Sequence, residues 1–207
     1  MMSNLLQKYK WTWLILAVCL IAAGALLFST LGIGKSKLPV MGQVADFQME
    51  NVDGSTVTLD DTKGKVRLMY FYFTSCPDVC PPTTMVLSQV QNELKKEEGL
   101  FGEKAAILSF SFDPETDTPE KIKAFGDQFF ADYSGWYFLR GDQEETRDLM
   151  QGSFKIPLIG NETSNFSHGN RIALVDGDHN IRKLYDATDP MQVKVEDIVK
   201  DLKSLVQ

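Results

Sequence analysis

The chain has 207 residues, of which 43% are hydrophobic and 24% charged, with 15 Gly, 8 Pro and 3 Cys. This composition is globular and excludes collagen-like, low-complexity and wholly disordered chains. Three cysteines exclude a disulfide-rich miniature scaffold and any zinc or iron–sulfur site with four cysteine ligands. Residues 1–37 contain four Lys and no acidic residue, so the remainder, with 17 basic and 28 acidic residues, carries a net charge of −11. An acidic body argues against a nucleic-acid partner, because neutralising phosphates requires clustered Lys and Arg.

The first feature along the chain is an uncharged stretch of 24 residues, Trp11–Gly34. At about 1.5 Å per residue, a helix of this length exceeds the roughly 30 Å of bilayer hydrocarbon. Trp11 and Trp13 stand at its start, where aromatic rings suit the headgroup level. A cleaved signal peptide has a shorter apolar region and a small-residue cleavage site, and this stretch ends instead in FSTLGIGK. We therefore expect an uncleaved transmembrane helix.

This helix predicts a single-pass protein of the cell membrane. The very short N-terminal flank carries two Lys and the amino group, which favours a cytoplasmic N-terminus and an extracytoplasmic body. No Arg-rich amphipathic presequence precedes the stretch, which favours a bacterial origin. The expected organisation is a cytoplasmic N-terminus at 1–10, an anchor at 11–34, a tether at 35–44 and an exported domain at 45–207.

The exported body begins with strand signals. Ala45–Val52 and Ser55–Leu59 flank Asp53-Gly54, a dipeptide typical of a tight hairpin turn. Val66–Phe73 and Ala105–Phe112 are nearly continuous apolar runs, which is typical of strands buried on both faces. These runs predict an N-terminal hairpin followed by central strands of a sheet.

Helix signals follow the central strands. Pro81-Pro82 opens a helix with apolar residues every four positions, and Thr118-Pro119 is a cap followed by a first-turn proline. Asp142-x-x-Glu145 resembles a capping box and predicts a helix to about Phe154.

The C-terminal part predicts one more hairpin and a closing helix. Arg171–Val175 and Ile181–Tyr185 flank the turn Gly177–Asn180, and Trp136–Leu139 is a short strand earlier in the chain. The closing helix is amphipathic, with apolar residues at 195, 198, 199, 202 and 205. Strands that alternate with helices predict an α/β domain with a largely parallel central sheet.

The chemistry-bearing motif is Cys76-Pro-Asp-Val-Cys80, placed between a predicted buried strand and a predicted helix. Open α/β folds bind ligands at this edge of the sheet, and a helix start supplies free N–H groups and partial positive charge that favour thiolates. A purely structural disulfide would close only a very small loop, so its entropic benefit is small. The spacing favours a redox or metal role while still permitting a disulfide.

A metal site needs a third ligand, and the chain has two His. His179 lies in the turn Gly-Asp-His-Asn and is expected to be a solvated hairpin residue. His168 precedes the strand Arg171–Val175, and a lone His at a strand entry is more often structural than a ligand. In a thioredoxin-like arrangement, however, the loop before this hairpin faces the cysteine loop. Two thiolates and one imidazole suit Cu(I), and Cu(II) with an added oxygen ligand. Asp78 is a candidate for that oxygen or for a group supporting the ligands, and is otherwise a turn residue.

The sequence shows no sign of haem attachment, of a serine hydrolase, of phosphate binding or of an EF-hand calcium site. The chain has no Cys-x-x-Cys-His, no Gly-x-Ser-x-Gly and no phosphate-binding glycine loop. The acidic segment Asp113–Glu120 does not have EF-hand spacing and is expected to be a helix cap with a solvated turn.

Three segments, FYFTSCPDVCPPT, SFDPETDTPEKIKAF and FSHGNRIALVD, together resemble the Sco/SenC family over nearly the whole exported body. The resemblance implies a thioredoxin-like central sheet flanked by helices, with an N-terminal anchor. It also implies one copper ion, Cu(I) or Cu(II), bound by Cys76, Cys80 and His168, with Asp78 matching the acidic residue between the two cysteines. Ser167 stands where family members often carry Asp before the ligand His, which would alter the surroundings of the copper ligands.

The family resemblance implies a metallochaperone rather than a conventional enzyme. Its expected partner is cytochrome c oxidase subunit II or another copper-accepting protein, along with thiol–disulfide exchange partners. An exported thiol–disulfide oxidoreductase or redox sensor that uses Cys76 and Cys80 without the His remains an alternative. A peroxiredoxin-like peroxidase is disfavoured, because Thr74 lies two residues before Cys76 rather than three.

Overall fold

The computed structural model describes residues 10–30, 38–156, 158–159 and 167–206, with the backbone alone at 10, 25–30, 158–159 and 167–168. The chain divides into two compact units, Met1–Lys37 and Leu38–Gln207. The second unit, called the body below, carries the candidate site.

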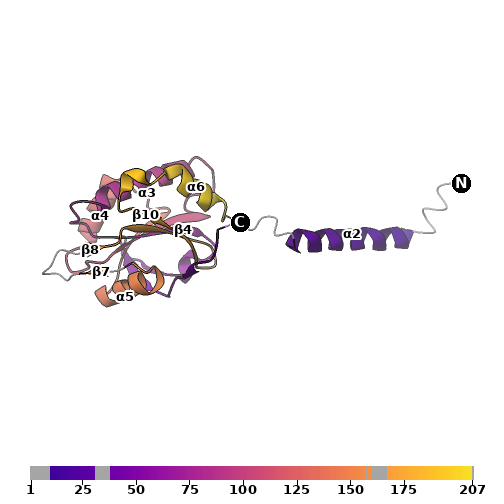
Figure 1. Ribbon diagram of the computed structural model, residues 1–207, viewed down its shortest axis with the longest axis horizontal. Helices are drawn as coiled ribbons and strands as arrows, with labels where there is room; N and C mark the ends of the chain where they lie inside the picture. Colours follow the sequence, from indigo (N-terminus) through magenta and orange to yellow (C-terminus); the bar gives the residue numbers. More distant parts are fainter. Residues whose placement is uncertain (1–9, 31–37, 157, 160–166, 207) are drawn as a thin grey trace. The chain divides into compact units, whose positions relative to one another are not determined.

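An eight-stranded mixed sheet forms the centre of the body (Figure 1). In spatial order its strands are β1 (Gly42–Gln43), β10 (Asn180–Asp186), β9 (Arg171–Val175), β4 (Val66–Tyr72), β5 (Ala105–Ser111), β6 (Trp136–Arg140), β2 (Gln48–Asn51) and β3 (Thr56–Thr58). In this sheet only the pairs β4–β5 and β5–β6 are parallel, and the other neighbours are antiparallel. The expectation of a largely parallel sheet is therefore wrong. Short turns make the hairpins β2–β3 and β9–β10 antiparallel, and each hairpin joins the central strands through β2 or β9, which runs antiparallel to its neighbour.

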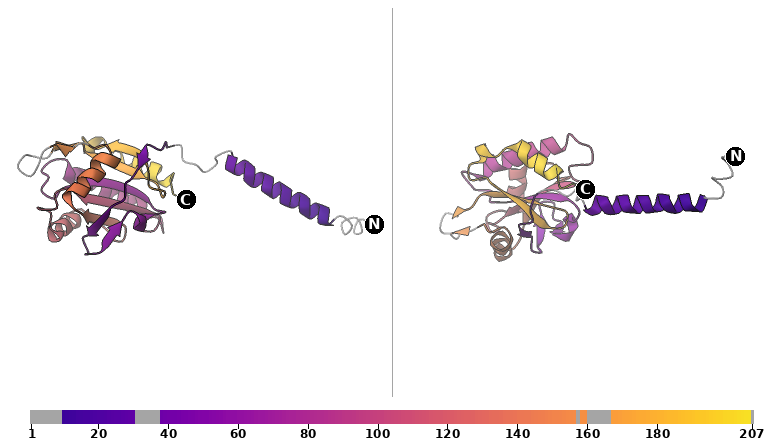
Figure 2. Two further views of the ribbon diagram at one scale, coloured as in Figure 1. Left: turned by 90° about the horizontal axis from the view of Figure 1, so that it is seen from below. Right: turned by 45° about the vertical axis from the view of Figure 1, so that its right-hand side comes forward.

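Helices cover both faces of this sheet. They are α3 (Cys80–Leu94), α4 (Pro119–Gln128), α5 (Gln143–Asp148) and α6 (Val195–Lys203), with single turns η1 (Asp60–Thr62), η2 (Leu149–Ser153) and η3 (Pro190–Gln192). Helices α3 and α6 lie on one side and α5 on the other, and a small ribbon of β7 (Leu158–Ile159) and β8 (Ser167–His168) lies at the end of the body opposite the C-terminus (Figures 1 and 2).

The predicted elements of the body form largely where the sequence indicates. Both hairpins are present as β2–β3 and β9–β10, and Thr118 caps α4 by accepting a hydrogen bond from the Lys121 N–H. Asp142 caps α5, but Glu145 accepts from the Gln48 N–H rather than completing a capping box. The α-helix expected to reach Phe154 ends at Asp148 and continues as the wider turn η2.

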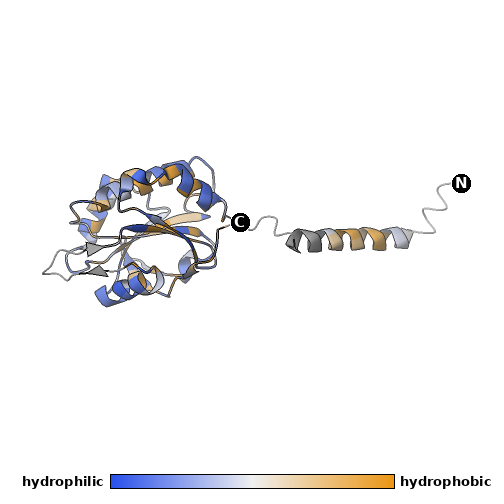
Figure 3. Cartoon of the chain, viewed as in Figure 1, coloured by the Kyte–Doolittle hydropathy of each residue, from blue (hydrophilic) through white to orange (hydrophobic). Residues whose placement is uncertain are grey.

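The N-terminal unit contains helix α2 (Lys10–Thr30), a run of 21 residues. Its described side chains include exposed Trp, Leu, Ile and Val residues, and Figure 3 shows apolar colouring along it. Among the described residues, no helix has both the length and the apolar character needed to cross a membrane. Residues 31–34 of the expected anchor lie outside the described chain.

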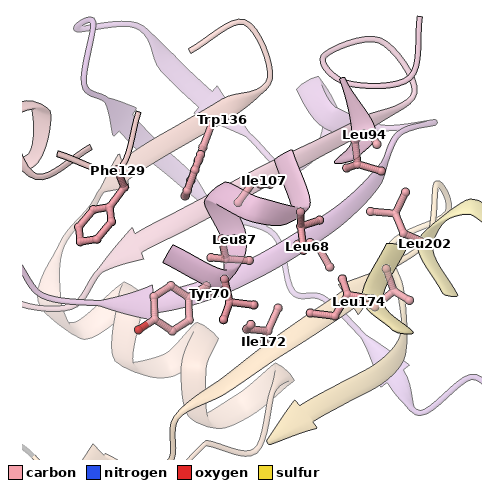
Figure 4. Close-up of a cluster of buried hydrophobic side chains, with 14 of the residues drawn as sticks. Leu68, Tyr70, Leu87, Leu94, Ile107, Phe129, Trp136, Ile172, Leu174 and Leu202 are labelled. Atoms are coloured by element: carbon pink, nitrogen blue, oxygen red, sulfur yellow. The ribbon is translucent and has the colours of Figure 1, made fainter. Parts of the chain in front are cut away.

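The core lies on both faces of β4, all seven residues of which are buried. Leu68, Tyr70 and Tyr72 point into a cluster with the inner faces of α3, α4 and α6, part of which Figure 4 shows. Met69 and Phe71 point into a second cluster, which is completed by the N-terminal hairpin and the α5–η2 segment. Burial on both faces explains why every residue of this strand except Arg67 is apolar or aromatic. It also fixes the end of β4, from which the cysteine loop departs.

Candidate functional site

The cysteine loop, residues 73–79, connects the end of β4 to the start of α3. Its first turn is closed by a hydrogen bond from the Cys76 N–H to the Phe73 carbonyl, 3.2 Å long. Helix α3 begins at Cys80 and has prolines in its first turn, where a missing N–H breaks no helical hydrogen bond. Both thiols therefore lie at the carboxyl edge of the sheet, as the sequence predicts.

The two thiols are free and adjacent. Cys76 is 8% exposed and Cys80 is fully buried, and no disulfide joins them. The Cys80 N–H donates to Cys76 Sγ at 3.4 Å. A hydrogen bond from the Cys80 thiol lowers the pKa of Cys76 to about 6; burial opposes this, and the N–H groups of residues 78–80 support it. The same hydrogen bond, burial and the Cys76 charge raise the pKa of Cys80.

This asymmetry defines what the pair can do. A thiolate at the start of a helix is both a nucleophile and a soft metal ligand. The buried second thiol lies close enough to share a metal ion or to form a disulfide with the first. The donor set therefore fits a thiophilic ion such as Cu(I).

The His168 backbone belongs to the ribbon β7–β8, where it pairs with Leu158. Its side chain lies outside the described residues. Two positions later, the buried Asn170 donates from Nδ2 to Thr83 Oγ1 at 2.8 Å, and Thr83 lies three positions after Cys80 on α3. The segment that carries His168 therefore meets the first turns of α3.

The pairing of β9 with β4 also places the segment before β9 near the cysteine loop. Strand β9 runs antiparallel to β4, with Ile172 opposite Tyr70. Because β4 enters the cysteine loop just after Tyr72, the residues that precede Ile172 run back toward that loop.

Asp78 is exposed in the cysteine loop. Among the side chains that the structure describes, no group of three His, Cys, Asp or Glu is placed to hold a metal ion. The role of Asp78 and the ligand role of His168 stay predictions.

His179 is not the solvated hairpin residue expected from the sequence. Its side chain is 17% exposed and its Nδ1 lies 2.9 Å from Nη1 of the fully buried Arg67. Its Nε2 lies 3.5 Å from Asp60 Oδ1. The turn folds back onto the start of β4, at the opposite end of that strand from the cysteine loop, so His179 is remote from the candidate site.

The acidic segment after β5 caps α4 as expected, and Glu115 and Thr116 in its turn are exposed, but Asp113 and Asp117 are buried. Asp117 has no exposed surface and accepts hydrogen bonds from Thr74, in the cysteine loop, and from Ser111, at the end of β5. Burial raises the pKa of this carboxyl, while its hydrogen bonds oppose the shift. No local pattern marks Asp117, because its three neighbouring segments meet only in the folded sheet.

Comparison with known proteins identifies the family. The family model described as SCO1/SenC matches residues 39–207. A SCO1 protein homolog of Bacillus subtilis (strain 168) is 34% identical over 170 residues, which cover 81% of this chain and 85% of that protein.

Solved structures of Sco family proteins are also similar to this chain. A SCO1/SenC family lipoprotein from Bacillus anthracis has a TM-score of 0.75 and 32% identity, over 83% of this chain and 99% of that one. BsSco, described as a member of the Sco family of cytochrome c oxidase assembly proteins with a disulfide switch, has a TM-score of 0.72 and 32% identity, over 83% and 96%. Bradyrhizobium japonicum ScoI with copper bound has a TM-score of 0.64 and 26% identity, over 79% and 99%.

The match spans essentially the whole body, and the curved sheet flanked by helices is the thioredoxin-like fold of these proteins. The cysteine loop, at the carboxyl edge of that sheet, falls within the matched region. The chain therefore belongs to the SCO1/SenC family.

Proposed function

We propose that this chain is a copper-binding metallochaperone that assists assembly of the copper centre of cytochrome c oxidase. The observation that carries the proposal is the cysteine pair at the start of α3, with a free, low-pKa Cys76 beside a buried Cys80. Two adjacent sulfur donors select soft ions such as Cu(I). The cysteine loop lies at the edge of the body, which suits transfer to a partner rather than permanent enclosure. The copper-bound relative supports the same choice of metal.

We assign the third ligand to His168. The hydrogen bond between Asn170 and Thr83 supports this assignment, because it ties the segment that follows His168 to the helix that starts at Cys80. An imidazole added to two thiolates lets the site hold copper in either oxidation state. Asp78, in the same loop, is then a candidate to support the ligands or to add an oxygen donor.

Copper titration of the reduced protein tests this function. We expect about one copper per chain for the wild type, and loss of stable binding in Cys76→Ala, Cys80→Ala and His168→Ala. Cys19→Ala and His179→Asn are matched controls, because they change the remaining cysteine and histidine outside the site. Stoichiometric binding that survives Cys76→Ala would refute the proposal.

The client we infer is the copper-accepting subunit II of cytochrome c oxidase. The relation of BsSco to a family of cytochrome c oxidase assembly proteins supports this inference. We also infer a single-pass membrane anchor at residues 11–34, with residues 1–10 cytoplasmic and the body exported. The uncharged stretch Trp11–Gly34 supports it. The tether expected at 35–44 is then shorter, because β1 (Gly42–Gln43) pairs with β10 in the sheet of the body.

A second candidate function is thiol–disulfide exchange or redox sensing. The opposed pKa shifts favour it, since the Cys76 thiolate can attack a partner disulfide and release one partner thiolate. Formation of the mixed disulfide removes the Cys76 charge that raises the pKa of Cys80, so Cys80 can then lose its proton, attack Cys76 Sγ and release the second partner thiolate. The disulfide switch described for BsSco supports this alternative. Disulfide reductase activity that survives His168→Ala and is lost in either cysteine variant would select it.

A further inference from the structure

Asp117 is a buried carboxylate whose partners are all uncharged. Its oxygens each lie 3.1 Å from the Thr74 N–H, and they also accept hydrogen bonds from the Thr74 and Ser111 hydroxyls. Among the described residues, no Lys or Arg forms an ion pair with it. A charge removed from water without a counter-ion needs several good hydrogen bonds. These donors supply them, and two of the three belong to Thr74.

These contacts connect the cysteine loop to the two chain segments beside it. Thr74 lies in the cysteine loop, Ser111 is the last residue of β5, and Asp117 lies just before α4. Ser111 pairs with Tyr72 across the parallel strands, so its hydroxyl is level with the start of the loop. One carboxylate therefore fixes the loop against the neighbouring strand.

The Asp117 side of this contact is itself held firmly. The Asp117 N–H donates to the Asp113 carbonyl at 2.9 Å, and Thr118 caps α4. Arg140, at the end of β6, donates to the Pro114 carbonyl through Nε and Nη2 at 3.0 and 2.9 Å. These hydrogen bonds hold in place the segment that carries the Asp117 carboxylate.

From Thr74 a short chain of contacts reaches the thiols. Thr74 is held through both its backbone N–H and its side chain. On either side of it, the Cys76 N–H binds the Phe73 carbonyl at 3.2 Å. Cys76 Sγ then accepts from the Cys80 N–H at 3.4 Å. Movement of Thr74 would therefore displace Cys76 from the start of α3.

We propose that Asp117 is the positioning residue of the cysteine pair: by holding Thr74 it keeps Cys76 over the start of α3, in the geometry needed to share a metal ion with Cys80. The effect on copper rests on the proposed function, whereas the effect on the loop does not. Groups that orient metal ligands in this way typically change metal affinity by about 10- to 100-fold when they are removed.

The test uses four variants of the full-length chain. Asp117→Asn removes the charge and one acceptor at nearly constant shape. Thr74→Val removes the hydroxyl and keeps the N–H, and Thr74→Ser restores the hydroxyl. Thr62→Val is the control for stability, because Thr62 is fully buried, donates to the Leu59 carbonyl and accepts from Arg67 at the far end of β4.

Two measurements are made on each variant. The first is hydrogen–deuterium exchange of the peptide that spans residues 73–80 in the metal-free, reduced protein. The second is Cu(I) affinity by competition with a chromophoric chelator. We expect Asp117→Asn and Thr74→Val to exchange about 10-fold faster in this peptide and to bind Cu(I) about 10-fold more weakly. Thr74→Ser should match the wild type in both, and Thr62→Val should lose thermal stability with neither local change.

The outcomes separate the two proposals. If Thr74→Val and Asp117→Asn exchange like the wild type, or change no more than Thr62→Val does, Asp117 only stabilises the fold and the inference is overturned. If the loop exchanges faster while Cu(I) affinity is unchanged, the positioning role toward the metal is overturned. If the wild type itself binds no copper, the proposed function fails, and the exchange measurement still decides whether Asp117 holds the loop.

Discussion

At the scale of single residues, the two cysteines differ because they meet the start of α3 differently. Cys76 Sγ accepts a hydrogen bond from the Cys80 thiol and faces the N–H groups of residues 78–80, whereas Cys80 has no exposed surface. The difference in surroundings, rather than in sequence, makes one thiol acidic and the other hard to ionise.

This difference predicts a pH profile for alkylation. The thiolate is the reactive form, so the rate of Cys76 modification by iodoacetamide should rise with pH and reach half its plateau near pH 6. An ordinary cysteine reaches that point near pH 8.5. Peptide mapping by mass spectrometry resolves Cys76 from Cys80, which should stay unmodified throughout. A Cys76 rate that keeps rising beyond pH 8 would contradict the structure.

A second prediction concerns His179 and stability. Burial, Arg67 and Lys63 lower its pKa below 6.5, and Asp60 opposes them. Because the folded state then binds this proton less readily than the unfolded chain, stability is fully present above pH 6.5 and is lost as pH falls through the folded pKa.

The variant His179→Asn isolates this effect, since Asn tolerates the left-handed backbone found there, with φ of 67°. The free energy of unfolding, measured in urea, should fall more steeply below pH 6.5 in the wild type than in the variant. Parallel curves from pH 8 to pH 5 would exclude a role for His179.

At the scale of elements, α3 carries the site because its inner face is fixed in the core. Leu87 is fully buried among side chains of the sheet, and Met85, on the same helix, is 40% exposed. Figure 4 shows Leu87 beside Tyr70.

Leu87→Ala should lower the free energy of unfolding by about 2–5 kcal/mol, because it leaves a cavity in a closely packed cluster. Met85→Ala should change it by less than about 0.5 kcal/mol. Chemical denaturation of the two variants measures both changes in the free energy of unfolding. Equal effects would mean that the helix packs through a different face.

The sequence predicts elements that depend on local patterns and misses features that depend on distant segments. The start of α3 and the cap at Thr118 follow from prolines, capping residues and periodicity, and the structure confirms both. Strand β1 pairs Gly42 with Ile181, across most of the body, and nothing near Gly42 signals that contact.

In the candidate site, too, local patterns predict some residues, whereas others depend on contacts between distant segments. Cys76 and Cys80 follow from their spacing between a strand and a helix. The burial of Asp117 could not be predicted, since it requires β4, β5 and the segment before α4 to lie side by side. The solvated position expected for His179 failed for the same reason, because its partner Arg67 lies 112 residues earlier.

At the scale of the whole molecule, the body and the N-terminal unit are separate compact units. All described residues of the two core clusters belong to the body, so we expect the body to fold without the N-terminal unit. We expect a chain that lacks residues 1–34 to melt cooperatively, within about 2 °C of the body in the full chain. The proposed anchor at residues 11–34 predicts that this shorter chain leaves the membrane fraction, whereas the full chain resists extraction at alkaline pH. A truncated chain that fails to fold, or a full chain that stays in the supernatant, would contradict this organisation.

In the proposed copper site, the metal is held by two sulfurs from Cys76 and Cys80 and by an imidazole from the segment before β9. X-ray absorption at the copper edge, on protein loaded with one equivalent of Cu(I), tests it most directly. We expect two sulfur neighbours and one imidazole nitrogen in the wild type, and loss of this spectrum in His168→Ala and in each cysteine variant. A spectrum without sulfur neighbours, or one left unchanged by His168→Ala, would contradict it.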